Sequence, residues 1–175
     1  MHQMARWEKV SFEQFAADWQ KYMTDYPRTE EELRAVYDAV KLPVRATSGS
    51  AGYDITAPVT ITLKPGESLR VPTGLRVWME EGWVLMIFPR SGMGYRYRLQ
   101  MDNTAGIVDA DYYGADNEGH ILTQVSIDTR EDKTLTVPAG TGFVQGLFMP
   151  FGVTVDDAAE GIRRGGFGST TPEGK

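Results

Sequence analysis

The spacing of hydrophobic residues changes near residue 42, where a helical period gives way to a shorter alternation. In the first part hydrophobic residues recur three or four positions apart, at Phe12, Phe15, Ala16, Trp19, Tyr22 and Met23, and again at Leu33, Val36, Tyr37 and Val40. These stripes predict two amphipathic helices with one apolar face each. Ser11 with Gln14, and Thr29 with Glu32, fit the capping-box pattern that starts a helix. We therefore expect residues 1–42 to form an N-terminal helical arm.

From residue 43 onward, short hydrophobic runs alternate with polar residues and are separated by glycine and proline turns. The runs that predict β-strands are 59–63, 68–71, 75–79, 83–88, 124–129, 134–137 and 143–149. Many short strands with frequent turns favour a mainly β sandwich or barrel of jelly-roll type, and the lack of βαβ alternation argues against a Rossmann or P-loop core. We expect this β-domain to span residues 43–157, followed by a flexible, glycine-rich C-terminal tail at 158–175.

The composition is typical of a soluble globular protein of ordinary size. The 175 residues are 41% hydrophobic and 24% charged, enough for one domain with an appendage. No apolar run reaches the roughly 18 residues that a membrane helix needs. Residues 1–10 lack the apolar core of a signal peptide, so we expect a cytoplasmic protein without membrane contact. The absence of cysteine excludes disulfides, thiolate zinc sites and a cysteine nucleophile.

The net charge of −6 argues against general affinity for a nucleic-acid backbone. A polyanionic ligand would therefore have to meet arginines that are gathered locally. The chain also lacks a Walker lysine motif, a G-x-S-x-G motif and a metalloprotease histidine pair, since His2 and His120 are its only histidines. The candidate chemistry has to come from other stretches.

The strongest candidate is the stretch from Gly106 to Gly114, which places Asp109, Asp111 and Tyr112 between two glycines. Gly106 can take a positive φ and Gly114 lets the backbone turn again, so we expect a tight hairpin or loop that presents these side chains to a cleft. Loops of this kind often carry catalytic groups. A solvated acidic turn between two strands is the alternative interpretation of this stretch alone.

Four further stretches carry polar groups beside or inside predicted strands. Residues 51–55 place Asp54 next to a glycine, and residues 89–94 end an apolar strand with an arginine, a hydroxyl and flexible backbone. Gln145 lies alone in an apolar strand, where a buried amide would need a hydrogen-bond partner. Residues 163–170 bring paired arginines and a phenylalanine among glycines. Taken singly, the first two stretches also fit strand-end turns, and the last fits a frayed terminus.

Taken in order, these stretches resemble the sequence motifs of the trimeric deoxyuridine triphosphatase (dUTPase) family, over about residues 51–171. The Arg-Ser-Gly run at Arg90 and the run from Asn103 to Gly114 resemble its second and third motifs, and G-G-F-G-S-T resembles its fifth. The resemblance implies a distorted jelly-roll β-barrel and hydrolysis of dUTP to dUMP and pyrophosphate, which keeps uracil out of DNA and supplies dUMP for thymidylate synthesis. It also implies a homotrimer whose sites combine motifs one, two and four of one chain, the third motif of a second and the tail of a third.

The resemblance further implies roles for individual residues. Asp109 would be the general base that activates water, and Gln145 would contact the α-phosphate. Mg²⁺ would bind mainly through the substrate phosphates, with Asp54 acting through water. The implied substrate-binding residues are Arg90, Ser91 and Gly92 for the phosphates, Asn103, Gly106 and Val108 in the uracil-reading hairpin, Tyr112 under the deoxyribose, and Arg163, Arg164, Phe167, Gly168 and Ser169 in the tail.

The chain departs from the family pattern at three places. The usual tail arginine would fall one residue before Arg163, so whether Arg163 or Arg164 reaches the γ-phosphate stays open. Residues 115–120 are longer than the usual link after the third motif. Gly142 and Val144 replace a basic residue and an alanine, which bears on packing more than on chemistry.

Two other classes of function remain as alternatives to a dUTPase. The related dCTP deaminases share the fold, but their hairpin lacks the D-x-D-Y arrangement that runs here from Asp109 to Tyr112. A regulator could instead use the dUTPase fold to bind another protein, through residues 111–120 or through the arm. We expect the apolar faces of the arm to pack on the main domain or on a neighbouring subunit, with a dedicated binding arm as the alternative.

Overall fold

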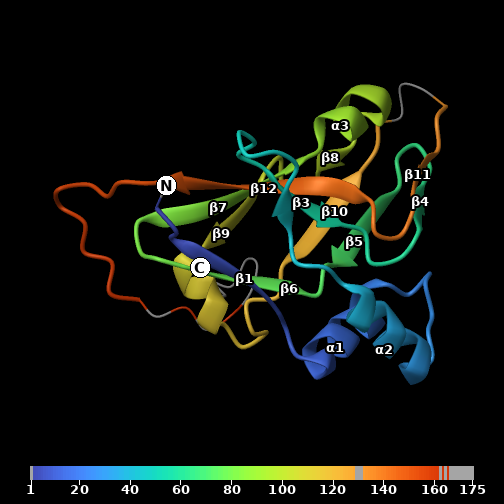
Figure 1. The fold of residues 1–175 in the computed structure, drawn as a ribbon, viewed down its shortest axis with the longest axis horizontal. Helices are drawn as coiled ribbons and strands as arrows, with labels where there is room; N and C mark the ends of the chain where they lie inside the picture. Colours follow the sequence, from blue (N-terminus) through green and yellow to red (C-terminus); the bar gives the residue numbers. More distant parts are fainter. Residues whose placement is uncertain (1, 129–131, 162, 164, 166–175) are drawn as a thin grey trace, which may run out of the picture.

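The computed structural model describes residues 2–128, 132–161, 163 and 165. Its framework is a set of short β-strands with helices on the outside (Figure 1). Helices α1 (Phe12–Tyr22) and α2 (Glu30–Ala39) lie together at one end of the strands, and α3 (Ser91–Tyr97) lies away from them (Figure 1). The mainly β architecture predicted from the alternating pattern is confirmed. Among the described residues, no helix combines the length and the apolar character needed to cross a membrane.

The largest sheet has five antiparallel strands and carries several of the candidate residues. Its order is β2 (Val44–Arg45), β3 (Tyr53–Thr56), β12 (Gly142–Pro150), β7 (Trp83–Pro89) and β9 (Gly106–Asp109). Because β12 pairs with β3 on one side and β7 on the other, a residue near its start lies between the two flanking strands.

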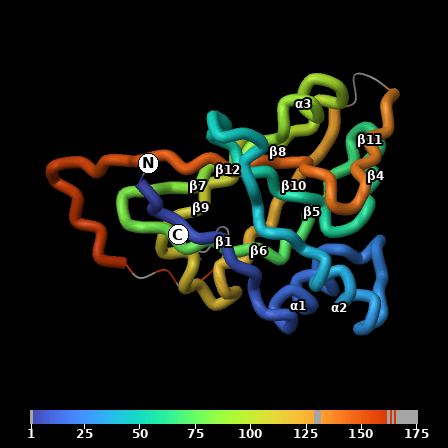
Figure 2. The backbone as a smooth tube through the Cα atoms, viewed as in Figure 1, coloured from blue at the N-terminus to red at the C-terminus, as the bar shows by residue number. Residues whose placement is uncertain are grey.

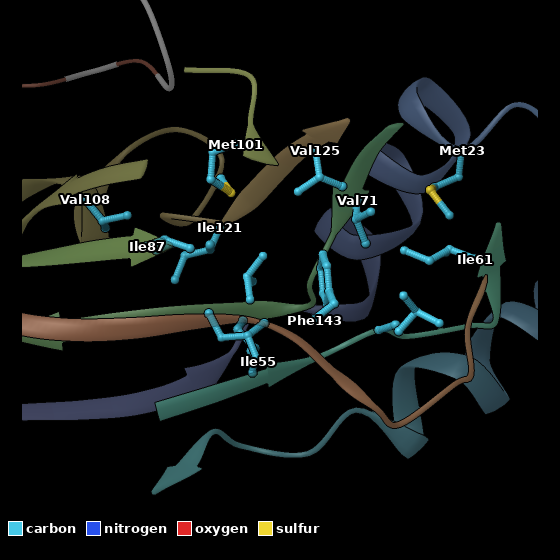
Figure 3. Close-up of a cluster of buried hydrophobic side chains, with 14 of the residues drawn as sticks. Met23, Ile55, Ile61, Val71, Ile87, Met101, Val108, Ile121, Val125 and Phe143 are labelled. Atoms are coloured by element: carbon cyan, nitrogen blue, oxygen red, sulfur yellow. The ribbon is translucent and has the colours of Figure 1, made fainter. Parts of the chain in front are cut away.

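Smaller sheets complete the β-domain. One has the order β5 (Ser68–Pro72), β10 (Leu122–Ser126) and β8 (Gln100–Met101), and another pairs β4 (Ile61–Leu63) with β11 (Leu135–Val137). Most strands predicted from alternation are present, although β10 begins two residues earlier than expected. Side chains between the sheets form the core shown in Figure 3, where Ile55, Val125 and Phe143 are each 0% exposed.

A strand in the first ten residues was not predicted. Strand β1 (Ala5–Lys9) pairs antiparallel with β6 (Leu75–Met79), so the N-terminal region is not wholly helical. Its sequence alternates, but Arg6, Glu8 and Lys9 give it little hydrophobic signal. Strand propensity depends strongly on the neighbouring strand, which the local sequence does not reveal.

Both predicted arm helices are present, and the arm packs on the β-domain of its own chain. Phe15, Trp19 and Met23 of the arm are buried in the common core, and α1 contacts β5. This burial contributes about 1.5–3 kcal/mol for a large apolar side chain. The apolar face of α1 therefore packs on the main domain, which is one of the two partners expected for it.

The two helix starts differ in how they are capped. At α2 the full capping box forms, with Thr29 accepting from the Glu32 N–H and Glu32 accepting from the Thr29 N–H. At α1 the Ser11 hydroxyl accepts from the Gln14 N–H, but the side chain of Glu118 accepts the Ser11 N–H instead of Gln14. The predicted hydrogen bond from the Ser11 N–H to the Gln14 side chain is therefore wrong, because Glu118, which is distant in sequence, accepts that N–H.

Candidate active site

The stretch from Gly106 to Gly114 is a strand followed by a 3₁₀-helix and not one tight loop as expected. Strand β9 ends at Asp109, which pairs with Val84 of β7, and η1 (Ala110–Gly114) follows directly. The expected positive φ at Gly106 is also wrong. A Cβ there would lie 3.1 Å from Cβ of Ile87, so the glycine allows close approach of β9 to β7.

The acidic residues of this stretch meet an arginine of the C-terminal segment. Arg163 donates from Nε to Oδ1 of Asp111 over 2.9 Å, and from Nη2 to Oδ2 of Asp109. The three residues line a cleft of about 1000 Å³, which Glu80 and Phe151 also border. Figure 2 shows how the chain after β12 leaves the sheets in a wide loop before this contact. The cleft thus pairs two carboxylates with one guanidinium.

The segment that follows Tyr112 forms hydrogen bonds with its hydroxyl. Its side chain is buried, and its hydroxyl donates to the carbonyl of His120 over 2.7 Å. Asn117 donates from Nδ2 to the same hydroxyl over 2.8 Å. Burial raises the pKa of Tyr112, so the phenol remains protonated at neutral pH. The guanidinium carbon of Arg163 lies 5.8 Å from the ring centroid, on the side of the cleft.

A second cluster joins Asp54, Arg90 and Gln145. Arg90 pairs through Nε with Oδ1 of Asp54 at 3.1 Å, and Gln145 is the register partner of Asp54 across β3 and β12. The expected partner of the Gln145 amide exists, since its Nε2 donates to the Pro89 carbonyl over 3.2 Å. Side chains that can contact phosphate and water are therefore gathered at one end of the large sheet.

Two glycines make room for this second cluster. A Cβ on Gly52 would lie 2.4 Å from Oε1 of Gln145, and a Cβ on Gly142 would lie 3.1 Å from Cδ and Nη1 of Arg90. The expectation that Gly142 bears on packing agrees with this contact. Neither glycine has a positive φ, so space and not backbone conformation accounts for them.

Ser91 and Gly92 begin a helix and not the flexible turn that the sequence suggested. Helix α3 starts at Ser91 and is followed by Arg98 in the left-handed conformation, with φ of 50°. Both residues are exposed beside Arg90, which precedes the helix. Only part of the Arg-Ser-Gly motif, the arginine, joins the cluster with Asp54.

Asn103 and Gly106 line a different pocket, of about 410 Å³, at the turn between β8 and β9. The backbone there is tightly turned, since the Ala105 N–H donates to the Asn103 carbonyl over 2.8 Å and Thr104 has φ of 71°. Val108 is 2% exposed and packs in the core, so only its backbone could face a ligand. This pocket presents backbone groups together with the amide side chains of Asn103 and Gln124.

No pattern in the sequence indicated the residues that border the pocket next to Asn103. Arg70 donates from Nε to Oε1 of Gln124 over 2.9 Å, and Gln124 donates from Nε2 to Asp102 over 2.8 Å. Burial acts to raise the pKa of Asp102, but the hydrogen bonds that its carboxylate accepts, among them those from Ser68 and Gln124, hold it below its usual value. These groups come from three strands or turns, so no local motif marks them. Asn117 and His120, which contact the Tyr112 hydroxyl, were also missed because no local motif marks them.

The single chain does not bring all candidate residues together. Asp109 faces Val84 on β7 and Gln145 faces Phe88, four residues further along the same strand. Four residues of an antiparallel strand span roughly 13 Å, and two strand spacings add about 10 Å across the sheet. The candidates Arg164, Phe167, Gly168 and Ser169 lie outside the described residues.

Comparisons with known proteins give a consistent result. The family model described as dUTPase matches residues 38–171. The deoxyuridine 5'-triphosphate nucleotidohydrolase of Lactococcus lactis subsp. lactis is 42% identical over 134 residues, 75% of this chain and 88% of that protein. The enzyme of the same name from Hahella chejuensis is 34% identical over 141 residues, 75% of this chain and 87% of its own.

Solved structures extend the comparison to the fold. The crystal structure of dUTPase from Streptococcus mutans is similar with a TM-score of 0.60 and 32% identity, covering 85% of this chain and 97% of that one. The dUTPase from phage phi11 of S. aureus has a TM-score of 0.54 at 22% identity, over 70% of this chain and 90% of that one. The second likeness concerns the fold alone.

Proposed function

The chain belongs to the dUTPase family, and on that basis we propose that it hydrolyses dUTP to dUMP and pyrophosphate. The observation that carries the proposal is the cleft at the end of β9, which Asp109, Asp111 and Arg163 line, with Tyr112 buried beside them. A carboxylate suits the activation of water, and a guanidinium suits a triphosphate. Family membership indicates dUTP as the substrate, and the cleft contains side chains suited to its hydrolysis.

Asp109 is the proposed general base. Its side chain is 47% exposed at the end of β9, so a water molecule can reach the carboxylate. In the proposed step Asp109 removes a proton from that water as its oxygen attacks the α-phosphorus, and pyrophosphate leaves with the electrons of the broken P–O bond. Gln145 contacts the α-phosphate and helps to place the water. Its own hydrogen bond to Pro89 orients the amide for that task.

The separation of Asp109 from Gln145 supports a site shared between chains. Their partners on β7 stand four residues apart, so the two side chains cannot meet at one phosphorus within a single chain. We therefore propose a C3 homotrimer in which Gln145 of one chain acts with Asp109 of a neighbour. The C-terminal tail of a third chain, with Phe167 as its aromatic residue, would close the site over the uracil and exclude water.

Selection of the nucleoside is proposed to rest on the pocket at Asn103 and on Tyr112. Backbone donors and acceptors at the turn after Asn103, together with its amide, would pair with the edge of uracil, and cytosine would leave buried polar groups unmatched. The ring of Tyr112 would lie under the deoxyribose, where a ribose 2′-hydroxyl would collide with it. A rigid ring is needed for such steric rejection.

Arg90, with Ser91 and Gly92 beside it, is proposed to contact the phosphates, and one tail arginine the γ-phosphate. Mg²⁺ fits this donor set as an ion held mainly by substrate. Asp54 offers one carboxylate already paired with Arg90, and the described residues hold no group of three or more His, Asp or Glu that could enclose a metal. Magnesium keeps several waters and binds through phosphates and few carboxylates, and when bound it would neutralise charge on the triphosphate.

The decisive experiment is a pyrophosphate-release assay across dUTP, dTTP, dCTP and UTP with magnesium present. We expect rapid release from dUTP and very little from the other three. Similar rates on two of these nucleotides would contradict the assignment. Ammonia release from dCTP would instead indicate a deaminase, and binding of dUTP without pyrophosphate release would favour a regulator.

A further inference from the structure

The N-terminal arm and the segment at 117–120 meet in a buried polar contact. Asp18 of α1 is 7% exposed and His120 is 0% exposed, and Nδ1 of His120 lies 2.5 Å from Oδ2 of Asp18. Nε2 of the same ring accepts the N–H of Gly74 over 2.9 Å. Because an accepting nitrogen carries no proton, His120 is neutral and donates from Nδ1 to Asp18.

The arm makes a second contact with this segment. Glu118 accepts the backbone N–H of Ser11 over 2.8 Å and its hydroxyl over 2.5 Å. Gln14 also donates to Oδ2 of Asp18 over 2.8 Å, which fixes the carboxylate that holds His120. Burial acts to raise the pKa of Asp18, but hydrogen bonds from His120 and Gln14 hold it below its usual value. Ser11 and Asp18 of the arm therefore both bind this segment, Ser11 through Glu118 and Asp18 through His120.

On its other side, the same segment holds Tyr112. The carbonyl of His120 accepts the Tyr112 hydroxyl, and Asn117 donates to that hydroxyl. The fit is close, since a Cβ on Gly119 would lie 2.7 Å from the Tyr112 carbonyl oxygen. His120 thus contacts the arm through its ring and Tyr112 through its backbone.

We propose that the N-terminal arm positions Tyr112 for selection of the deoxyribose, with Asp18 and Asn117 as positioning residues. This inference rests on the proposed function of Tyr112 as the floor of the sugar site. The arm lies almost wholly outside residues 38–171, which the family model covers, so it is not part of the matched domain. Residues 115–120, the long link after the third motif, contain the partners of its Ser11 and Asp18.

The physical reason is the precision that steric rejection requires. A 2′-hydroxyl adds a single non-hydrogen atom to the sugar, and a ring displaced by a fraction of an ångström can admit it. The two hydrogen bonds at the hydroxyl fix the far end of the Tyr112 ring, and the Asp18–His120 contact fixes the carbonyl that accepts one of them. Loss of that contact should loosen the ring and reduce the preference for deoxyribose while the catalytic groups stay in place.

The test compares the ratio of kcat/KM for dUTP to kcat/KM for UTP between the wild type and four variants. Asp18→Ala and Tyr112→Phe should each lower the ratio roughly 2- to 30-fold, the range of coupling through packed and hydrogen-bonded networks. Asp18→Asn should keep a ratio near that of the wild type, because its amide oxygen can still accept from His120. The double variant Asp18→Ala/Tyr112→Phe should show a ratio no lower than that of Tyr112→Phe. Both changes act on the hydrogen bond from the Tyr112 hydroxyl to the His120 carbonyl.

Leu33→Ala is the matched control for general destabilisation. Leu33 is a buried residue of α2, 4% exposed, and takes no part in the contact between Asp18 and His120. It should lower Tm yet leave the dUTP/UTP ratio unchanged, because a smaller folded fraction scales both rates equally. An unchanged ratio in Asp18→Ala, or an equal fall in Leu33→Ala, would overturn the inference.

Binding of dUMP and UMP separates this inference from the proposed reaction. Calorimetry on the full chain needs no turnover, and Asp18→Ala should narrow the dUMP/UMP affinity ratio by the same factor as the kinetic ratio. A wild type that binds dUMP selectively but releases no pyrophosphate overturns only the reaction. A wild type that binds dUMP and UMP equally overturns the positioning role.

Discussion

Arg163 donates a hydrogen bond to Asp109, so the proposed general base is paired with a cation that lies 54 residues later in the same chain. The side chain of Arg163 is 16% exposed, which makes it the more buried partner of the pair. A guanidinium binds phosphate as well as carboxylate through charge-assisted, often bidentate hydrogen bonds. In the proposed trimer the tail acts on a different chain, so assembly would release Asp109 from its own Arg163 and leave the carboxylate free to activate water.

Replacement of Asp109 by Asn should abolish most of the turnover. The amide keeps the shape of the side chain but cannot remove a proton, and loss of a general base costs on the order of 10²- to 10⁴-fold in rate. Affinity for dUMP, measured by calorimetry, should stay within a few-fold of the wild type. Near-normal turnover would transfer the role of base to another group, with Asp111 as the first candidate.

The two tail arginines should differ in their effect on catalysis. Arg163→Ala removes the group that lies between Asp109 and Asp111, and we expect kcat/KM for dUTP to fall roughly 10- to 150-fold, as for loss of a hydrogen bond to a charged group. Arg164→Ala should have a smaller effect. Steady-state pyrophosphate release measures both. Equal losses would mean that the two guanidinium groups share the contact.

Complementation between inactive chains tests the shared site. Asp109→Ala and Gln145→Ala chains, each inactive alone, should regain about a quarter of wild-type activity when equal amounts are refolded together, because random C3 trimers restore that share of sites. Mass measurement confirms that mixed trimers form. No recovery in confirmed mixed trimers would mean that each chain carries a complete site.

A second mixture of inactive chains tests which chain contributes the tail to a site. Asp109→Ala chains refolded with chains truncated after Gly161 should also recover activity, because we propose that hairpin and tail of one site come from different chains. Failure of this mixture alone, with success of the first, would show that Arg163 acts on Asp109 within one chain, as in the single-chain contact.

The link between Glu118 and Ser11 should make stability depend on pH. Burial acts to raise the pKa of Glu118, but hydrogen bonds from the Ser11 hydroxyl and N–H hold it below the usual 4.5. A lowered folded-state pKa gives stability that is present above about pH 4.5 and is lost as the pH falls through the folded-state value. The difference in Tm between wild type and Glu118→Gln should therefore shrink from neutral pH toward pH 3. Glu31→Gln, at an exposed position of α2, should show no such trend.

Gly119 should tolerate no side chain, in contrast to Gly114. Gly119 has φ of 70°, and its Cβ would lie 2.7 Å from the Tyr112 carbonyl oxygen, whereas a Cβ on Gly114 would meet nothing within 4 Å. Backbone strain of this kind costs on the order of 1–3 kcal/mol before any clash is counted. Chemical denaturation should show a large loss for Gly119→Ala and little for Gly114→Ala. Similar stabilities would mean that the 115–120 segment can shift freely.

Local patterns in the sequence were enough to predict elements whose determinants lie a few residues apart. The capping box at Thr29 and Glu32 forms as predicted because both partners are within one helical turn. The strand at 75–79 follows from alternation, which depends only on backbone geometry. The order of polar stretches likewise identified the family, since a motif is a property of neighbouring residues.

The predictions that failed depend on residues from elsewhere in the chain. The start of α1 is capped partly by Glu118, 107 residues away, and β1 forms because β6 offers a free edge. Gly106 is required by the approach of Ile87 and not by its own φ. In each case the local sequence allows more than one structure, and a contact across the fold selects one.

The sequence by itself determined the helices of the arm, most strands of the β-domain and the residue types available for chemistry. Only the tertiary structure decided that Asp18 meets His120, 102 residues away, and that Asp109 and Gln145 stand opposite residues of β7 that are four positions apart. The reason is physical. Hydrophobic spacing and caps act through the backbone geometry of consecutive residues, whereas a site depends on which strands pair and in which register, and that is set by the packing of the whole chain.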